Sequence, residues 1–230
     1  MKTIGLVGGM SWESTAHYYR AINEGVRARR GGLHSAELLL ASLDFAPLAR
    51  MQDEGRWQDA TAVLAAAARR LEGAGADFFL LCTNTMHRVA AEVEAAVSIP
   101  LLHIADATAA AARARGVRRV GLLGTAFTME QAFYRERLAR QHGLEVLTPP
   151  AADRALVHRV IYEELCLGRT LDPSRHAFRR IAGALVDAGA EGVILGCTEI
   201  GMLLGQADLP VPVFDTAALH AAAAVEHALA

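Results

Sequence analysis

The chain has 230 residues, 53% of them hydrophobic and 21% charged, with a formal net charge of -2 at pH 7. This length suits one large α/β domain or two smaller ones, and either can bury a core. The nearly neutral charge, without a basic stripe and interleaved aromatic residues, argues against a nucleic-acid partner. The apolar runs are too short for a membrane span, so we expect no membrane partner.

Composition also limits the cofactors. Lys2 is the only lysine and precedes the first apolar run, a poor place for the Schiff base of a pyridoxal phosphate enzyme. The cysteines, Cys82, Cys166 and Cys197, are too scattered for a disulfide framework or a zinc motif, and the histidines show no metal-ligand spacing. The N-terminus begins as a strand without a signal-peptide pattern. We therefore expect a cytoplasmic protein with free thiols, no metal and no cofactor.

Short apolar runs alternate with alanine-rich helical stretches along the chain. The predicted strands are residues 3–8, 37–44, 77–82, 100–104, 119–123, 145–147, 192–196 and 211–214. Predicted helices between them include residues 14–28, 57–73, 128–141, 154–167, 174–188 and 217–229. Nearly continuous apolar strands separated by helices are typical of parallel sheets covered on both faces. Ligands on such sheets bind beyond the carboxyl ends of the strands.

The chain also repeats itself. IGLVGGM (4–10) resembles VGLLGTA (120–126) at an offset of 116, and AGADFFLLCTNT (74–85) matches AGAEGVILGCTE (188–199) without a gap at an offset of 114. IPLLHIAD (99–106) has a looser partner in LPVPVFDT (209–216). We therefore predict two similar parallel-sheet α/β domains with pseudo-two-fold symmetry and an active site in the cleft between them. The N-terminal domain would be residues 1–115 plus the helix in 216–230, and the C-terminal domain residues 116–215.

The repeat assigns the position that matters in CTNTMH. In the gap-free register Cys197 falls on Thr83, whereas Cys82 falls on Gly196. Side chains alternate between the two faces of a strand, so a shift of one residue sends a group elsewhere. The position equivalent to Cys197 therefore belongs to Thr83, and Cys82 is a neighbour that could tune the site or pack in the core.

Both of these strand ends precede a helix, so local N–H groups and the helix dipole favour an anion such as a substrate carboxylate. Small polar residues follow each strand, and the loops GGMSWEST (8–15) and GTAFT (124–128) add glycines and hydroxyls. Neither loop is a dinucleotide fingerprint or a P-loop. Cys166 lies in the helical stretch EELCLG and is expected to be a small core residue.

At this point the motifs indicate a family. GGMS (8–11), TNT (83–85), GTAFT (124–128) and GCTE (196–199), in this order on duplicated halves, resemble the aspartate/glutamate racemase superfamily along essentially the whole chain. The nearest resemblance is to its broad-specificity amino-acid racemase branch. In typical members one cysteine thiolate removes the α-proton of an amino acid and a second thiol returns a proton to the opposite face, without a cofactor.

The resemblance implies that Cys197 is the base and that Thr83, standing where the family usually has cysteine, is its weaker partner. Catalysis should then be slow and biased in direction, with the L form losing its proton to Cys197. Glu199 would meet the α-ammonium. The residues implied in substrate binding are Met10, Ser11, Gln52, Asn84, Thr85, Thr125, Thr128, Thr198 and Glu199.

Departures from the family narrow the substrate. Glutamate racemases of peptidoglycan synthesis usually have an Asp-Ser-Gly motif near the N-terminus, where this chain has GGMS. We therefore do not expect a glutamate racemase dedicated to the cell wall. Aspartate racemases bind the side-chain carboxylate with basic residues, and two stretches of this chain correspond to theirs. Residues 43–52 contain Arg50, whereas residues 161–168 contain the acidic Glu163 and Glu164. A neutral side chain, as in homoserine, therefore stands beside aspartate and glutamate.

Two other functions remain open at this stage. With one competent thiol, the same scaffold would suit decarboxylation or isomerisation of a dicarboxylate, as in relatives of arylmalonate decarboxylase and maleate isomerase. A non-catalytic amino-acid-binding protein is the third reading. The expected partners are a small amino-acid substrate and, as an oligomer, a second copy of the chain in a homodimer.

Overall fold

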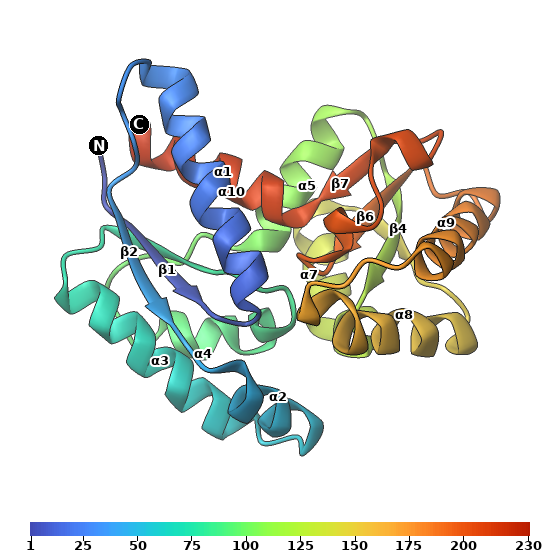
Figure 1. The fold of residues 1–230 in the computed structure, drawn as a ribbon, viewed down its shortest axis with the longest axis horizontal. Coiled ribbons are helices and arrows are strands. Elements are labelled where there is room, and N and C mark those ends of the chain that lie inside the picture. The colour runs from blue at the N-terminus through green and yellow to red at the C-terminus, as the bar shows by residue number, and fades with distance from the viewer. The chain divides into compact units, whose positions relative to one another are not determined.

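The computed structural model describes residues 1–230 and contains two compact units (Figure 1). The first unit comprises Met1–Ile104 together with His220–Ala230, and the second comprises Ala105–Leu219. The division expected from the sequence, residues 1–115 with 216–230 and residues 116–215, differs by assigning residues 105–115 and 216–219 to the first domain. Both units are mixed α/β structures built on parallel sheets, as predicted.

The first unit contains a three-stranded parallel sheet with the order β2-β1-β3. Its strands are β1 (Ile4–Gly8), β2 (Leu38–Ser42) and β3 (Phe78–Leu81). Its helices are α1 (Trp12–Arg30), α2 (Phe45–Asp53), α3 (Trp57–Gly73), the 3₁₀ turn η1 (Thr85–Val89) and α4 (Ala90–Glu94). Helix α1 begins at the N-cap Ser11 and ends at Gly31, whose positive φ of 75° is favourable only for glycine.

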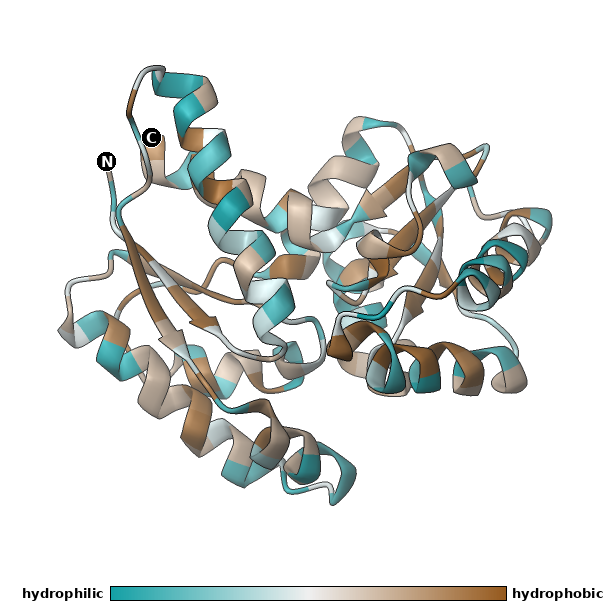
Figure 2. Cartoon of the chain, viewed as in Figure 1, coloured by the Kyte–Doolittle hydropathy of each residue, from teal (hydrophilic) through white to brown (hydrophobic).

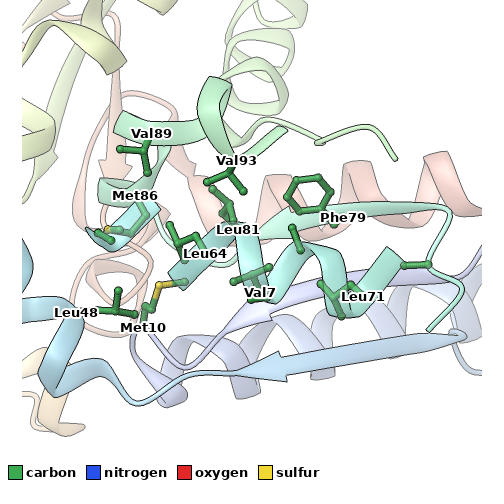
Figure 3. Close-up of a cluster of buried hydrophobic side chains, with 14 residues drawn as sticks. Val7, Met10, Leu48, Leu64, Leu71, Phe79, Leu81, Met86, Val89 and Val93 are labelled. Carbon is green, nitrogen blue, oxygen red and sulfur yellow. The ribbon is translucent and has the colours of Figure 1, made fainter. Parts of the chain in front are cut away.

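Helix α3 covers one face of this sheet. Figure 3 shows the buried cluster in which Val7 and Phe79 of the sheet lie against Leu64 and Leu71 of α3. The opposite face carries the alternate residues, and there the Phe78 ring meets His227 of α10 (Thr216–Leu229) edge-on, with ring centroids 4.6 Å apart. Two-sided coverage explains why the strands are almost uniformly apolar in Figure 2.

The end of α10 is fixed within the first unit. His220 is fully buried, its Nδ1 lies 2.9 Å from the Tyr18 hydroxyl, and its Nε2 lies 2.8 Å from the Leu102 carbonyl oxygen. The backbone N–H of Lys2 donates to the Ala228 carbonyl at 2.9 Å. The last residues of the chain are therefore part of the same core as the first strand.

The second unit contains a four-stranded parallel sheet with the order β5-β4-β6-β7. Its strands are β4 (Arg119–Gly124), β5 (Glu145–Leu147), β6 (Gly192–Gly196) and β7 (Val213–Asp215). Its helices are α5 (Ile104–Ala114), α6 (Ala126–Glu130), α7 (Ala132–His142), α8 (Ala151–Glu163) and α9 (Asp172–Asp187), with 3₁₀ turns η2 (Leu165–Leu167), η3 (Ile200–Met202) and η4 (Gln206–Asp208).

The internal repeat extends to the alignment of the strands. In each unit the first strand lies at the centre and pairs with the strand that ends at the polar motif. The paired residues are Ile4 with Phe78 and Val7 with Leu81 in the first sheet, and Val120 with Gly192 and Leu123 with Leu195 in the second. The offsets of 116 and 114 convert one set of pairs into the other. Thr83 and Cys197 therefore follow equivalent strand positions.

Three predicted elements need correction. Residues 100–104 do not form a strand, because only Leu101 bridges to Phe79 before α5 begins at Ile104. The helix expected over residues 128–141 is two helices, since Gln131 has an extended backbone with ψ of 153°. The helix expected over residues 154–167 ends at Glu163, and the 3₁₀ turn η2 follows it. No helix is both long and apolar enough to cross a membrane.

Candidate active site

The loop after β1 is held by a small hydrogen-bond network. The N–H of Gly9 donates to Thr15 Oγ1 at 2.8 Å, and the same hydroxyl donates to the Ser11 carbonyl at 2.9 Å. The Ser11 hydroxyl caps α1 by accepting from the N–H of Ser14 at 3.3 Å. Met10 and Ser11 are both buried, so this loop presents a fixed backbone at the end of the sheet.

The loop after β3 carries Thr83, Asn84 and Thr85, all of them less than 10% exposed. His87 anchors this loop, because its Nδ1 lies 2.7 Å from the Thr83 carbonyl oxygen and its Nε2 accepts from the N–H of Ile104 at 3.3 Å. Since Nε2 is the acceptor, Nδ1 carries the proton and donates to Thr83. His87 is 3% exposed, so it supports Thr83 from within the core and not from the surface.

Cys82 belongs to the core. It is fully buried, its N–H donates to the Val7 carbonyl at 2.9 Å, and it follows Phe78 and Leu80 on the strand face that α10 helps to cover. Burial in these apolar surroundings raises the pKa of the Cys82 thiol. A neutral, enclosed thiol in this position fills space and has no route to a ligand.

Gln52 is 2% exposed and reaches toward η1 from α2. Its amide Nε2 lies 2.9 Å from the Met86 sulfur, an acceptor much weaker than an oxygen. Gln52 therefore lies buried between α2 and η1, and its role in substrate binding stays a prediction.

In the second unit, Thr125 and Thr128 form the corresponding loop after β4. Thr125 is the N-cap of α6, its hydroxyl accepts from the N–H of Thr128 at 3.3 Å, and the two hydroxyls lie 3.2 Å apart. The N–H of Ala126 donates to His158 Nδ1 at 3.1 Å. This loop combines hydroxyls with the positive end of a helix, although α6 is only a short helix.

The loop after β6 brings together Cys197, Thr198 and Glu199. The Cys197 thiol donates to Glu199 Oε2 at 3.0 Å, and the Thr198 hydroxyl donates to the same oxygen at 2.7 Å. The hydroxyl proton of Thr198 is thus engaged by Glu199, and the part of Thr198 in substrate binding stays a prediction. All three residues are less than 10% exposed.

Cys166 is a residue that sequence reasoning missed. It was expected to be a core residue on a helix, but it lies on the 3₁₀ turn η2, is half-buried, and its thiol is 3.8 Å from Glu199 Oε1. Glu199 therefore has a thiol beside each carboxylate oxygen. The sequence did not predict this contact, because we assumed an α-helix here. A 3₁₀ turn orients successive side chains differently from an α-helix.

The electrostatics of this cluster favour the neutral thiol. Burial, together with the negative charge of Glu199 and the neighbouring Cys166, raises the pKa of Cys197 well above its usual value. Cys197 therefore rests as a thiol whose proton points at a carboxylate. It can become a thiolate if that carboxylate accepts the proton.

Within each unit, the strand ends gather the residues expected from the sequence. The first unit places Met10, Ser11, Thr83, Asn84 and Thr85 on loops after β1 and β3, and the second places Thr125, Thr128, Cys197, Thr198 and Glu199 on loops after β4 and β6. Trp12 is 67% exposed and lines a groove between α1 and β2, so it packs in neither the core nor these loops. No group of three or more His, Cys, Asp or Glu side chains is arranged to hold a metal ion.

Two repeated parallel α/β units with polar motifs at equivalent strand ends define a duplicated enzyme fold, and the same arrangement occurs in known proteins. The chain superposes on a candidate Asp/Glu racemase from Yersinia pestis with a TM-score of 0.93 and 54% identity, covering 100% of both chains. An aspartate racemase homologue from Pyrococcus horikoshii OT3 matches with a TM-score of 0.86 and 37% identity, again covering 100% of both chains. The broad-specificity amino-acid racemase of Bacillus subtilis (strain 168) is 26% identical over 165 residues, which cover 71% of this chain and 70% of that relative.

The family model for Asp/Glu/Hydantoin racemases matches residues 7–224. The chain therefore belongs to the Asp/Glu/hydantoin racemase family. The resemblance drawn from the motifs is confirmed, and with it an amino-acid racemase that works without pyridoxal phosphate.

Proposed function

We propose that the protein racemises aspartate, glutamate or homoserine by moving the α-proton between Cys197 and Thr83. The observation that carries this proposal is the equivalence of the two residues in the matched registers of the two sheets. Thr83 and Cys197 each lie two residues after the matched pair members Leu81 and Leu195. Each retains slight exposure, 7% for Thr83 and 8% for Cys197. By contrast, the Cys82 thiol is fully buried, and its equivalent Gly196 has no side chain.

Cys197 acts first in the L-to-D direction. Glu199 accepts the thiol proton across the 3.0 Å hydrogen bond, and the resulting thiolate takes the α-hydrogen of the L-amino acid as a proton. The electron pair of the C–H bond stays on the substrate and spreads into its carboxylate. Donors around that carboxylate stabilise the developing charge, and we assign this role to Asn84, Thr85, Thr125 and Thr128.

Thr83 completes the turnover by donating its hydroxyl proton to the opposite face of the α-carbon. Donation leaves a Thr83 alkoxide, which takes a proton from solvent water, while Glu199 releases to solvent the proton that it took from Cys197. In the reverse direction the neutral hydroxyl of Thr83 would have to lose its proton first, and its pKa lies far above that of a thiol, so Thr83 is a poor base. The hydrogen bond from His87 to the Thr83 carbonyl holds this residue in place. The pairing of a thiol with a hydroxyl therefore predicts turnover that is slow and biased toward loss of the L-enantiomer.

The experiment that tests the proposal follows the α-hydrogen by proton NMR in deuterated water. Single enantiomers of aspartate, glutamate and homoserine are incubated separately with the protein. Loss of the α-signal from an L-enantiomer, with the opposite enantiomer appearing on a chiral column, supports racemisation and identifies the substrate.

Two outcomes contradict the proposal. Binding without exchange for every amino acid tested would identify a binding protein, and release of CO₂ from a substituted malonate would identify a decarboxylase. A Cys197→Ser variant run in parallel ties any exchange to this thiol.

A further inference from the structure

The loop that carries Thr83 leaves the sheet at this residue. The N–H of Cys82 still donates to the Val7 carbonyl of the neighbouring strand at 2.9 Å, but the N–H of Thr83 turns back to the Leu81 carbonyl at 2.8 Å. The Thr83 carbonyl is bonded by the His87 imidazole, whose Nδ1 lies 2.7 Å away. The placement of Thr83 therefore depends on the groups that hold His87.

His87 is held at both nitrogens of its ring. While Nδ1 donates to Thr83, Nε2 accepts from the N–H of Ile104 at 3.3 Å. The ring also lies against that of His103, with the centroids 4.4 Å apart, and both histidines are buried. His103 and Ile104 belong to the short segment that leads from the bridge at Leu101 into α5. This segment fixes the position and the tautomer of the imidazole.

The C-terminal helix α10, which lies beside α1 (Figure 1), holds the same segment. His220 Nε2 lies 2.8 Å from the Leu102 carbonyl oxygen, and Nδ1 lies 2.9 Å from the Tyr18 hydroxyl. A carbonyl can only accept, so Nε2 carries the proton of the neutral ring and Nδ1 accepts from the Tyr18 hydroxyl. Tyr18 and His220 are fully buried. We call the connected groups the imidazole network: Tyr18, His220, residues 102–104 and His87.

The second unit holds its equivalent residue in a simpler way. The Cys197 carbonyl accepts from the backbone N–H of Ile200 at 3.1 Å. In the gap-free register of the repeat, Gly201 stands at the position of His87. A hydroxyl gives up its proton less readily than a thiol, so Thr83 must be placed more accurately than Cys197 to act as a donor. The imidazole network thus supports the weaker of the two proton donors.

We propose that the imidazole network positions Thr83 for proton donation, with Tyr18 and His220 as positioning residues. This inference rests on the proposed function, because it concerns the step assigned to Thr83. After Cys197 has taken the α-proton, the electron pair left on the α-carbon forms its new bond to a proton from one of two donors. A proton from Cys197 restores the L form, and one from Thr83 gives the D form. Loss of the network should weaken the second path and leave the first intact.

The test measures both products from L-aspartate, L-glutamate and L-homoserine in deuterated water. Chiral chromatography with mass detection separates the deuterated L form, made with retention, from the D form, made by inversion. Tyr18→Phe keeps the ring but removes the hydroxyl. The ratio of inversion to retention should fall at least about fivefold, because a small displacement of a reacting group costs a large factor in rate. Tyr19→Phe removes an exposed hydroxyl from the same helix and should leave the ratio unchanged.

Two variants of His220 separate its hydrogen bond to Leu102 from its packing. The amide of glutamine reaches about as far as Nε2 and can still donate to the Leu102 carbonyl, whereas the amide of asparagine reaches only about as far as Nδ1. His220→Asn should therefore lower the ratio, and His220→Gln should bring it back toward the wild-type value. His227→Asn removes an imidazole from the same helix, where the ring packs on Phe78, and should not change the ratio.

Amide hydrogen exchange of peptides that cover residues 78–89 measures the support of the loop without substrate. Exchange at residues 83–87 should be faster in His220→Asn than in His227→Asn, and equal exchange would overturn the inference. So would a wild-type ratio of products in both Tyr18→Phe and His220→Asn, an outcome that leaves the proposed function standing. If the wild-type protein removes no α-hydrogen from any L-enantiomer, the proposed function is wrong and this inference falls with it.

Discussion

The Cys197 thiol and the Glu199 carboxylate form a hydrogen bond of 3.0 Å in which the thiol is the donor. Glu199 is 3% exposed, so water screens this pair only weakly. The carboxylate has two opposing effects on Cys197. It offers an acceptor for the thiol proton, yet its negative charge makes the thiolate less stable and raises the pKa of Cys197.

Replacing Glu199 with Gln separates these effects. The variant loses the proton acceptor, so α-hydrogen exchange should fall by about 10²-fold or more. It also loses the charge that opposes the thiolate, so the pKa of Cys197 should fall and alkylation by iodoacetamide at pH 8 should become faster. In the wild-type protein, where the pKa is raised, the alkylation rate should still be rising above pH 9.

Peptide mass spectrometry distinguishes Cys197 from the half-buried Cys166 in this measurement. Glu163→Gln is the control, because this exposed residue of α8 has no side-chain partner. Slower alkylation of Cys197 in the Glu199→Gln protein would refute the electrostatic account.

The two buried thiols should respond differently to substitution by serine. Cys197→Ser should lower exchange by about 10²- to 10⁴-fold, because a hydroxyl at this position cannot act as the base at neutral pH. Cys82→Ser should keep most of the exchange, while losing about 1–3 kcal/mol in free energy of unfolding for a hydroxyl in apolar surroundings. Exchange rates by NMR and urea unfolding measure the two effects separately. A Cys82→Ser protein that folds normally but shows no exchange would reverse the assignment.

Thr83→Cys restores two thiols at equivalent strand ends. A thiol has a pKa near 8.5 and forms its anion far more readily than a hydroxyl, so kcat in the D-to-L direction should gain most. We expect the ratio of the kcat values for the two enantiomers, measured at saturating substrate, to move toward one. Thr83→Ser keeps the hydroxyl and serves as the control, with a ratio like that of the wild type. Full activity of Thr83→Ala in both directions would remove Thr83 from the mechanism.

Asp106 provides a pH-dependent contribution to the stability of the second unit. It accepts hydrogen bonds from Arg137 Nε at 2.7 Å, from Arg137 Nη2 at 2.6 Å and from His142 Nε2 at 2.8 Å. Burial opposes the charge of Asp106, but these partners outweigh it and lower the pKa of the carboxyl below 3.8. A lowered pKa stabilises the folded state at any pH above 3.8, and this contribution is lost as the pH falls through the folded-state value.

Asp106→Asn should therefore lose about 1 kcal/mol at pH 7, a modest figure because the carboxylate is 37% exposed and partly screened. The difference from wild type should shrink as the pH falls below 3.8 and through the lowered pKa of the folded state. Urea unfolding at the two pH values measures it, with Asp187→Asn as a control at an exposed position without partners. A difference that is the same at both pH values would show that lost packing, rather than charge, is responsible.

Much of the fold could be predicted because buried parallel strands leave a strong signal. The β1, β3, β4 and β6 sequences are nearly continuous apolar runs, and the repeat predicted between them reappears in the pairing of the strands. Residues 100–104 carry a similar run, yet the segment turns into α5 after one bridge. An apolar run indicates that a segment is buried, but a buried turn before a helix has the same apolar sequence as a buried strand.

The site was harder to predict where contacts are distant in sequence. The positions of Thr83 and Cys197 followed from the repeat. The contact of Cys166 with Glu199 joins residues 33 apart, and a 3₁₀ turn that no local pattern indicated creates it. The support of Thr83 by His87 depends likewise on the N–H of Ile104, which fixes the imidazole tautomer. Such contacts depend on tertiary structure, and the spacing of residues in the sequence does not indicate them.

The burial of His220 and the following residues in the first unit also sets an order of events during synthesis. The first 104 residues leave the ribosome early, but the helix that closes one face of their sheet is made only after the whole of the second unit. The second unit has its complete sequence by Leu219 and can finish folding first. The core of the first unit must then wait, with part of its apolar surface open, until residues 220–230 emerge. A premature stop near residue 219 would therefore damage the first unit more than the second.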